Sequence, residues 1–226
     1  MSRSGFSLVE LLIATSLSAF VLIGISTIGA SIARNQVEGI RSGTQVGWSV
    51  VSYMSMAKEI EDSNVLVFPV SNGDQADQIV VCKNWSRAMG GGPPTGARLD
   101  PGVVSVIQYC VDPTAATPPE TGFKIRRYAN VGAAVTCPTA GVPAGCTTDV
   151  GPGWTENGNP GYGVIGYRVE KLTATPLVFQ RDNGIGGVRV RYAIGRQTPT
   201  TNEPTPKYTT FNYGITMAKQ YSSTLD

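Results

Sequence analysis

The sequence predicts an α+β fold in which one long N-terminal helix packs on an antiparallel β-sheet head. Three observations predict it. Residues 11–33 form an unbroken apolar run without a charged side chain. A helical pattern of apolar residues continues that run to about residue 62. Beyond residue 69, short apolar segments alternate with turns that hold most of the chain's 27 glycines and 15 prolines, a composition typical of a β-rich, loop-heavy domain.

The apolar run is long enough to cross a membrane. Its 23 residues, at about 1.5 Å each, exceed a hydrocarbon core of about 30 Å. A secretory signal peptide has a shorter apolar core, about 7–15 residues, and an Ala-x-Ala-like cleavage site, which this segment lacks. A plain signal anchor does not need Glu10 at its membrane entry, where a carboxylate is costly and usually functional.

The residues around Glu10 resemble a known processing motif. After the basic leader Met1–Gly5, the segment Gly5-Phe6-Ser7-Leu8-Val9-Glu10 is similar to the prepilin cleavage motif of type IV pilins and pseudopilins. The resemblance implies that a prepilin peptidase cuts between Gly5 and Phe6 and methylates the new amine of Phe6. It also implies insertion in the bacterial inner membrane through residues 6–33. Assembly with other pilins by an inner-membrane platform would then place the chain in an extracellular pilus, or fimbrium.

The resemblance also gives Glu10 an assembly role. A lone carboxylate buried among packed apolar helices is expensive. The ammonium group of Phe6, from the same or a neighbouring subunit, would neutralise Glu10 and set the register of the helices. The alternative is that Glu10 is solvated at the headgroup boundary without a role.

The helix is expected to continue beyond the apolar run. Val46, Val50, Tyr53, Ala57 and Ile60 recur at helical spacing, and residues 34–62 contain no proline. This stripe is expected to dock on the sheet, because Ser52, Ser55, Lys58, Glu59 and Glu61 occupy the other side. The predicted organisation is a leader at 1–5, a helix at 6–62 and a β-rich head at 63–226.

Alternating patterns bounded by turn residues predict the strands of the head. The expected strands are residues 78–83, 103–111, 123–128, 162–170, 177–180, 188–194 and 209–217. Strands 103–111 and 123–128 are expected to pair as a hairpin. Segments 88–102 and 129–160, rich in glycine and proline, are expected to be surface loops.

The four cysteines are expected to form disulfides, since an extracellular head lies in an oxidising environment. Cys82, Cys110, Cys137 and Cys146 allow three connectivities. The favoured pairing is Cys82 with Cys110, in strand-like runs, and Cys137 with Cys146, around a short loop. Free thiols remain an alternative, and the cysteine spacing does not fit a zinc site.

Composition argues against an enzyme. The chain has no histidine, the commonest general base and transition-metal ligand. It lacks a phosphate-binding glycine loop as well, so no catalytic residue, resident metal or cofactor is predicted. Asp74 and Asp77, with residues 71–73, could supply oxygen ligands to calcium, but a plain Asn-Gly turn with solvated acids is the far commoner arrangement and is the one expected here.

Other residues suggest surface interactions. Lys124, Arg126 and Arg127, with Arg189 and Arg191 on another strand, could form a basic patch for DNA, but a solvated sheet face explains them as well, and the net charge of +2 does not favour nucleic acid. Trp85 and Trp154 could be adhesive anchors or local core, and local core is favoured.

Three segments of the head resemble the PilW-like (PulJ-type) minor pilins. They are the predicted hairpin 103–128, the strand around residues 184–192 and the closing strand 208–217. The resemblance implies a structural minor pilin that primes assembly or sits near the filament tip, with adhesion and twitching motility among the functions of such pili. The alternatives are a major pilin, a type II secretion pseudopilin, or a single-pass membrane-anchored binding protein that does not polymerise.

Overall fold

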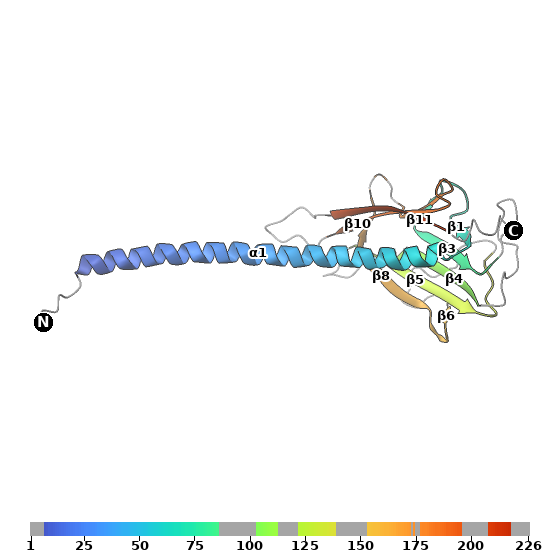
Figure 1. The fold of residues 1–226 in the computed structure, drawn as a ribbon, viewed down its shortest axis with the longest axis horizontal. Coiled ribbons are helices and arrows are strands. Elements are labelled where there is room, and N and C mark those ends of the chain that lie inside the picture. The colour runs from blue at the N-terminus through green and yellow to red at the C-terminus, as the bar shows by residue number, and fades with distance from the viewer. Residues whose placement is uncertain are drawn as a thin grey trace. The chain divides into compact units, whose positions relative to one another are not determined.

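The computed structural model describes residues 7–85, 103–112, 122–138, 153–172, 174, 177–195 and 208–217. In these residues a single helix, α1 (Leu8–Glu61), precedes eleven strands (Figure 1). The chain divides into two compact units, Met1–Thr44 and Gln45–Asp226. The described part of the first unit is the beginning of α1. The second unit contains the end of α1 and all the strands.

The described strands form one sheet, which is antiparallel apart from a single bridge between β5 and β6. Its order is β1-β3-β4-β5-β8-β10-β9-β2, with β11 paired to β10, and β6 paired to β5 and β7. The bounds are β1 Val65–Phe68, β2 Gln75–Ala76, β3 Gln78–Lys83, β4 Val104–Asp112, β5 Phe123–Gly132, β6 Thr155–Glu156, β7 Asn159–Pro160, β8 Tyr162–Glu170, β9 Phe179–Asp182, β10 Gly187–Gly195 and β11 Tyr208–Thr216. The predicted α+β class, a long helix with a large antiparallel sheet, is confirmed.

The longer strands lie close to their predicted positions. β3 and β8 have the predicted bounds, and β4 pairs with β5 as the expected hairpin. Four short strands, β1, β2, β6 and β7, were not predicted, because each has only two to four residues and shows little alternation. The prediction of a loop over 129–160 is therefore wrong where β5 extends to Gly132 and where β6 and β7 form. Segment 88–102 lies outside the described residues.

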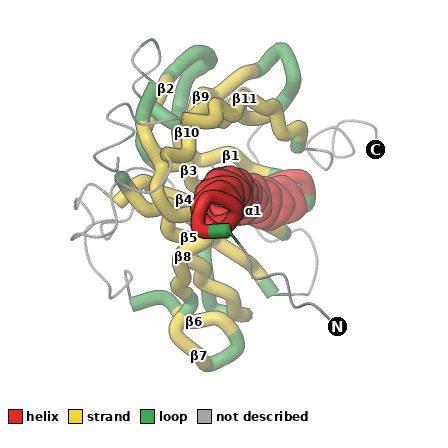
Figure 2. The backbone as a smooth tube through the Cα atoms, turned by 90° about the vertical axis from the view of Figure 1, so that its left-hand side faces the viewer, coloured by secondary structure: helices red, strands yellow, loops and turns green. Residues whose placement is uncertain are grey.

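Both faces of the sheet bury apolar side chains. One face packs against the end of α1, which runs across it (Figure 2). This core includes Met56 and Ile60 of α1 together with Ile79, Tyr109 and Val190 of the strands. Alternate residues of β1, β3 and β4 point to the opposite face and form a smaller core. The alternation of strand side chains thus supplies two cores from one sheet.

The face of α1 that meets the sheet differs from the predicted one. Ala57 and Ile60 are buried as expected, but Val46 and Val50 remain 50% and 47% exposed. In their place the helix buries Ser49 and Ser52, at 3% and 1% exposure. The expected separation into an apolar inner side and a polar outer side is therefore wrong for the first turns of this segment.

Close approach explains the buried serines. The hydroxyl of Ser52 shares its one proton between two acceptors, the carbonyl of Ile165 on β8 and that of Trp48 on α1. A Cβ atom at Gly166 would lie only 3.1 Å from Ser52 Oγ, so α1 and β8 approach closely at this point. The Ser52 hydroxyl is therefore hydrogen-bonded despite its burial, so burying it does not cost the free energy of an unpaired polar group. That cost was the reason to expect Ser52 on the outer side of α1.

Candidate functional site

Two side-chain caps close the first turn of α1. The backbone N–H of Ser7 donates to Glu10 Oε2 at 3.1 Å, and the backbone N–H of Val9 donates to Ser7 Oγ at 3.3 Å. This is a capping box, in which a serine and the glutamate three residues later satisfy free N–H groups at a helix start. Glu10 is therefore hydrogen-bonded within one chain, to the residue that follows Phe6. Gly5 and Phe6 lie outside the described residues.

The segment Leu8–Ile40 is long and apolar enough to cross a membrane, by length and composition, and its apolar core has no buried residue. Its hydroxyl groups are satisfied by the helix itself. Thr15 donates to the carbonyl of Leu11 at 3.0 Å, and Ser26 donates to that of Leu22 at 2.6 Å. Such internal bonds let hydroxyl side chains face an apolar environment without an unpaired polar group.

In the second unit, Glu59 joins α1 to the sheet through a cluster of hydrogen bonds. Arg127 on β5 donates to both carboxylate oxygens of Glu59 at 2.6–3.0 Å. The same guanidinium donates to both oxygens of Glu156 on β6, at 2.9 and 3.1 Å. Tyr109 on β4 donates its hydroxyl to Glu59. We call these four residues the helix clamp.

The electrostatics of the helix clamp favour its charged form. Burial opposes the charge on Arg127, but hydrogen bonds to Glu59 and Glu156 outweigh it and raise the pKa of Arg127. The hydrogen bond from Arg127 lowers the pKa of Glu156. Burial, reinforced by the charge on Glu59, raises the pKa of Tyr109 well above its ordinary value. The ion pairs and the neutral phenol therefore persist at neutral pH and hold the helix to the sheet.

The structure joins Cys82 to Cys137, with Cα atoms 6.0 Å apart, so the favoured pairing of Cys82 with Cys110 is wrong. Cys82 lies opposite Val106 in the β3–β4 ladder, and Cys110 lies opposite Gln78. Four residues of strand therefore separate the two cysteines along the sheet, about 13 Å at the usual rise. A disulfide needs Cα atoms within about 7 Å.

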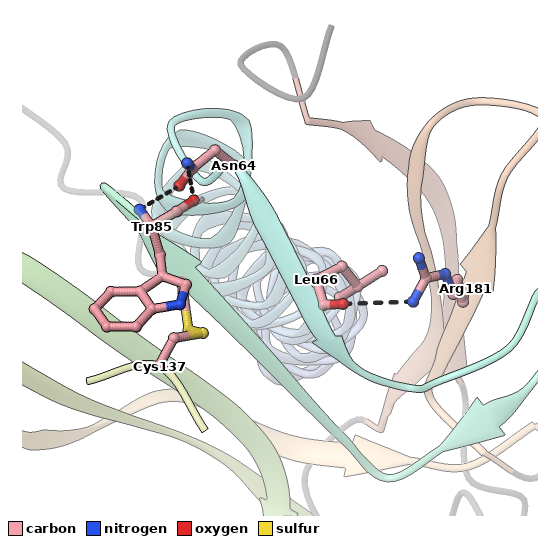
Figure 3. Close-up of a disulfide and its surroundings, with 6 residues drawn as sticks. Asn64, Leu66, Trp85, Cys137 and Arg181 are labelled. Carbon is pink, nitrogen blue, oxygen red and sulfur yellow. Dashed lines mark hydrogen bonds between the residues drawn. A yellow bond between two sulfur atoms is a disulfide. The ribbon is translucent and has the colours of Figure 1, made fainter. Parts of the chain in front are cut away.

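The second favoured pairing, Cys137 with Cys146, is excluded by the same bond, since Cys137 is occupied. Cys110 is also disulfide-bonded, and Cys146 lies outside the described residues. The Cys82–Cys137 bond fastens the chain after β5 over the smaller core, beside the indole of Trp85 (Figure 3). Trp85 and Trp154 both pack against that core, as expected.

The residues considered as calcium ligands make other contacts. Asp74 accepts a hydrogen bond from the backbone N–H of Ser71 at 2.8 Å, and Asp77 pairs with Lys171. Asn72 accepts from the backbone N–H of Asn183 at 2.9 Å. Among the described residues, no group of three acidic, histidine or cysteine side chains is placed to hold a metal.

The basic residues do not form one patch. Arg126 and Arg127 point to opposite faces of β5. Arg126 is buried against Asp112 at 2.7 Å, and Arg127 belongs to the helix clamp. Arg189 pairs with Asp182, and Lys124 lies over the ring of Tyr167 at 5.8 Å. Arg126 and Arg127 are thus paired with carboxylates inside the head, and Arg189 is paired with one nearer the surface.

Two residues that hold the head together were missed by sequence reasoning. The side chain of Asn64 bonds both the N–H and the carbonyl of Trp85 (Figure 3). Arg181 is buried and donates to the carbonyls of Pro69 and Val70 at 3.1 and 2.9 Å. Neither position has a sequence signal, because both partners are backbone atoms distant in the chain. The capping box did have one, the pattern Ser-x-x-Glu before an apolar run.

Comparison with known proteins assigns the N-terminus. Residues 1–26 match the family model of the prokaryotic N-terminal methylation motif, which is the N-terminus of type IV pilins and pseudopilins. No curated protein and no solved structure matches the chain. The match covers the processing motif and the first apolar turns of α1, and the chain therefore has a pilin-like N-terminus followed by a pilin-like α+β fold.

Proposed function

We propose that this chain is a structural minor pilin of a type IV pilus, held in the inner membrane by α1 until it enters the filament. The single observation that carries the proposal is the methylation motif at residues 1–26, placed directly on an apolar helix whose side chains are exposed. A helix of this kind needs either lipid or other helices around it. Membrane insertion supplies the first, and assembly with other pilins supplies the second.

The capping box supports the assembly role of Glu10. Cleavage after Gly5 would create an amine on Phe6, and Glu10 already bonds the N–H of the next residue, Ser7. The carboxylate is thereby held near the place where the new positive charge arises. In an apolar filament core, pairing with Phe6 of the same or a neighbouring subunit would remove the cost of a lone charge.

The minor-pilin subclass draws support from the three segments of the head that are similar to PilW-like proteins. They correspond to the β4–β5 hairpin, the strand β10 and the closing strand β11. In this role the chain would prime assembly or sit near the tip, with the prepilin peptidase and the assembly platform as partners. Proteins with this N-terminus are generally structural rather than enzymatic, so we propose no catalytic activity.

The test is fractionation of cells that express the full chain in its own pilus system. We expect a shortened form that depends on the prepilin peptidase and that appears in sheared filaments at low abundance relative to the major subunit. Gly5→Leu should leave the chain uncleaved and confined to the membrane. A wild-type chain that stays uncleaved, or that is cleaved but never enters filaments, would contradict the proposal. High abundance in filaments would instead indicate a major pilin.

A further inference from the structure

Two of the edge strands of the sheet, β1 and β11, differ in how they are protected. β1 is four residues long, has an irregular register between Leu66 and Phe68, and is followed by Pro69. Short strands, bulges and prolines are common devices against pairing with other chains. β11 is nine residues long and pairs regularly with β10 along its whole length. It contains no proline and no charged residue, and none of the described strands covers its other edge.

The hydrogen-bond pattern shows which groups of β11 point outward. The backbone N–H of Arg191 on β10 donates to Val178, on the side away from β11. Arg191 and its partner Asn212 therefore form a non-hydrogen-bonded pair. Because such pairs alternate with hydrogen-bonded pairs in an antiparallel ladder, the outward N–H and C=O groups belong to Tyr208, Thr210, Asn212, Gly214 and Thr216. These five residues are all exposed.

Apolar side chains lie beside this edge. The ring of Tyr213 on β11 packs against Tyr53 of α1, with centroids 4.7 Å apart. Val46 and Val50 share the face of α1 that carries Tyr53, since they precede it at spacings of seven and three residues. All three are partly exposed, at 50%, 47% and 38%. The core between α1 and the sheet is thus incompletely covered on the side of β11, within the described residues.

We propose that the outer edge of β11 binds an extended strand of a neighbouring subunit in the filament. The strand would bond the five outward backbone positions and place apolar side chains toward Val46, Val50 and Tyr53. It would be uncharged over that length, because neither β11 nor residues 46–57 of α1 offers a charge to pair with one. Strand addition of this kind obtains affinity from main-chain bonds and specificity from alternate side chains.

A neighbouring subunit is the expected source because the exposed apolar residues of α1 continue in sequence from Leu8 to Met54. The inference rests on the proposed function, which brings that helix into contact with other subunits. The edge of β11 adjoins the last exposed residues of the same helix through the contact of Tyr213 with Tyr53. A subunit that covers the exposed apolar residues of α1 is therefore also placed to pair with the edge of β11.

The test compares Asn212→Pro with Asn212→Ala in the full-length chain, expressed in cells that lack the native copy. Proline removes an N–H that points outward and is not needed by β10, a position where edge strands tolerate it. Alanine keeps that N–H. We expect about a tenfold lower content of Asn212→Pro than of Asn212→Ala in sheared filaments, with equal cleavage at the N-terminus and equal melting temperatures. Equal content would overturn the inference.

A photocrosslink decides the matter if the proline variant is less stable. Benzoylphenylalanine at Asn212 should join the chain to an extended segment of another filament subunit, identified by peptide mass. The same probe at Tyr162, 44% exposed on β8, is the matched control and should not give that product. Attachment to residues 218–226 of the same chain, to a protein outside the filament, or to nothing would overturn the inference. An uncleaved wild-type chain absent from filaments would instead refute the proposed function, and with it this inference.

Discussion

Replacing Arg127 by methionine should destabilise the head by about 2 kcal/mol. The change removes five hydrogen bonds to Glu59 and Glu156 and leaves two carboxylates facing each other. Breaking a fully buried ion pair costs about 3–5 kcal/mol. The side chains of Arg127, Glu59 and Glu156 are 17%, 22% and 38% exposed, so water compensates part of that loss and the estimate falls to about 2 kcal/mol.

The assay is urea unfolding of the full chain in a mild detergent, followed by tryptophan fluorescence. The matched control is Lys83→Met, which removes a 2.8 Å ion pair to Asp62 between side chains that are 32% and 42% exposed. That pair should contribute about 0.5 kcal/mol. Adding Glu59→Gln to Arg127→Met should cost less than Glu59→Gln alone, because the two side chains share the same bonds. Equal losses for Arg127→Met and Lys83→Met would refute the reasoning.

Three further predictions concern the disulfides, acid stability and the first turn of α1. Removing the Cys82–Cys137 bond, which closes a loop of 55 residues, should lower the free energy of reversible unfolding by about 4 kcal/mol. Peptide mapping without reduction should find Cys110 joined to Cys146. A peptide that joins Cys82 to Cys110 would contradict this. Because the pKa of Glu156 is lowered in the fold, its contribution to stability is complete above the ordinary pKa of about 4.3 and is lost as the pH falls through the folded pKa. Below about pH 4.3, the urea midpoint should therefore fall more steeply for the wild type than for Glu156→Gln. Parallel curves would count against the ion pair. Glu10→Gln keeps a side chain able to complete the capping box but loses the charge, so it should impair filament entry as strongly as Glu10→Ala while membrane insertion persists; normal entry of Glu10→Gln would show that capping alone suffices.

The sequence predicted the fold class well because its main signals are local. An apolar run of membrane length and strands of six or more residues carry their periodicity in the chain itself. β3, β8 and the β4–β5 hairpin were found for that reason. The processing motif was equally visible, since its residues are consecutive.

The parts that were not predicted depend on contacts distant in the sequence. The inner face of α1 could not be identified from polarity, since Ser52 is satisfied by the carbonyl of Ile165. The disulfide depended on the register of β3 against β4, which two isolated strand patterns do not define. The helix clamp joins residues 59, 109, 127 and 156, and nothing in the sequence relates an acid on the helix to an arginine 68 residues later.

The central claim is that residues 1–26 act as a prepilin segment, and the mass of the N-terminal peptide tests it most directly. In protein taken from sheared filaments, the first peptide should begin at Phe6 and be heavier by one methyl group on its amine. A first peptide that begins at Met1, or at a site within or after the apolar run, would contradict the claim.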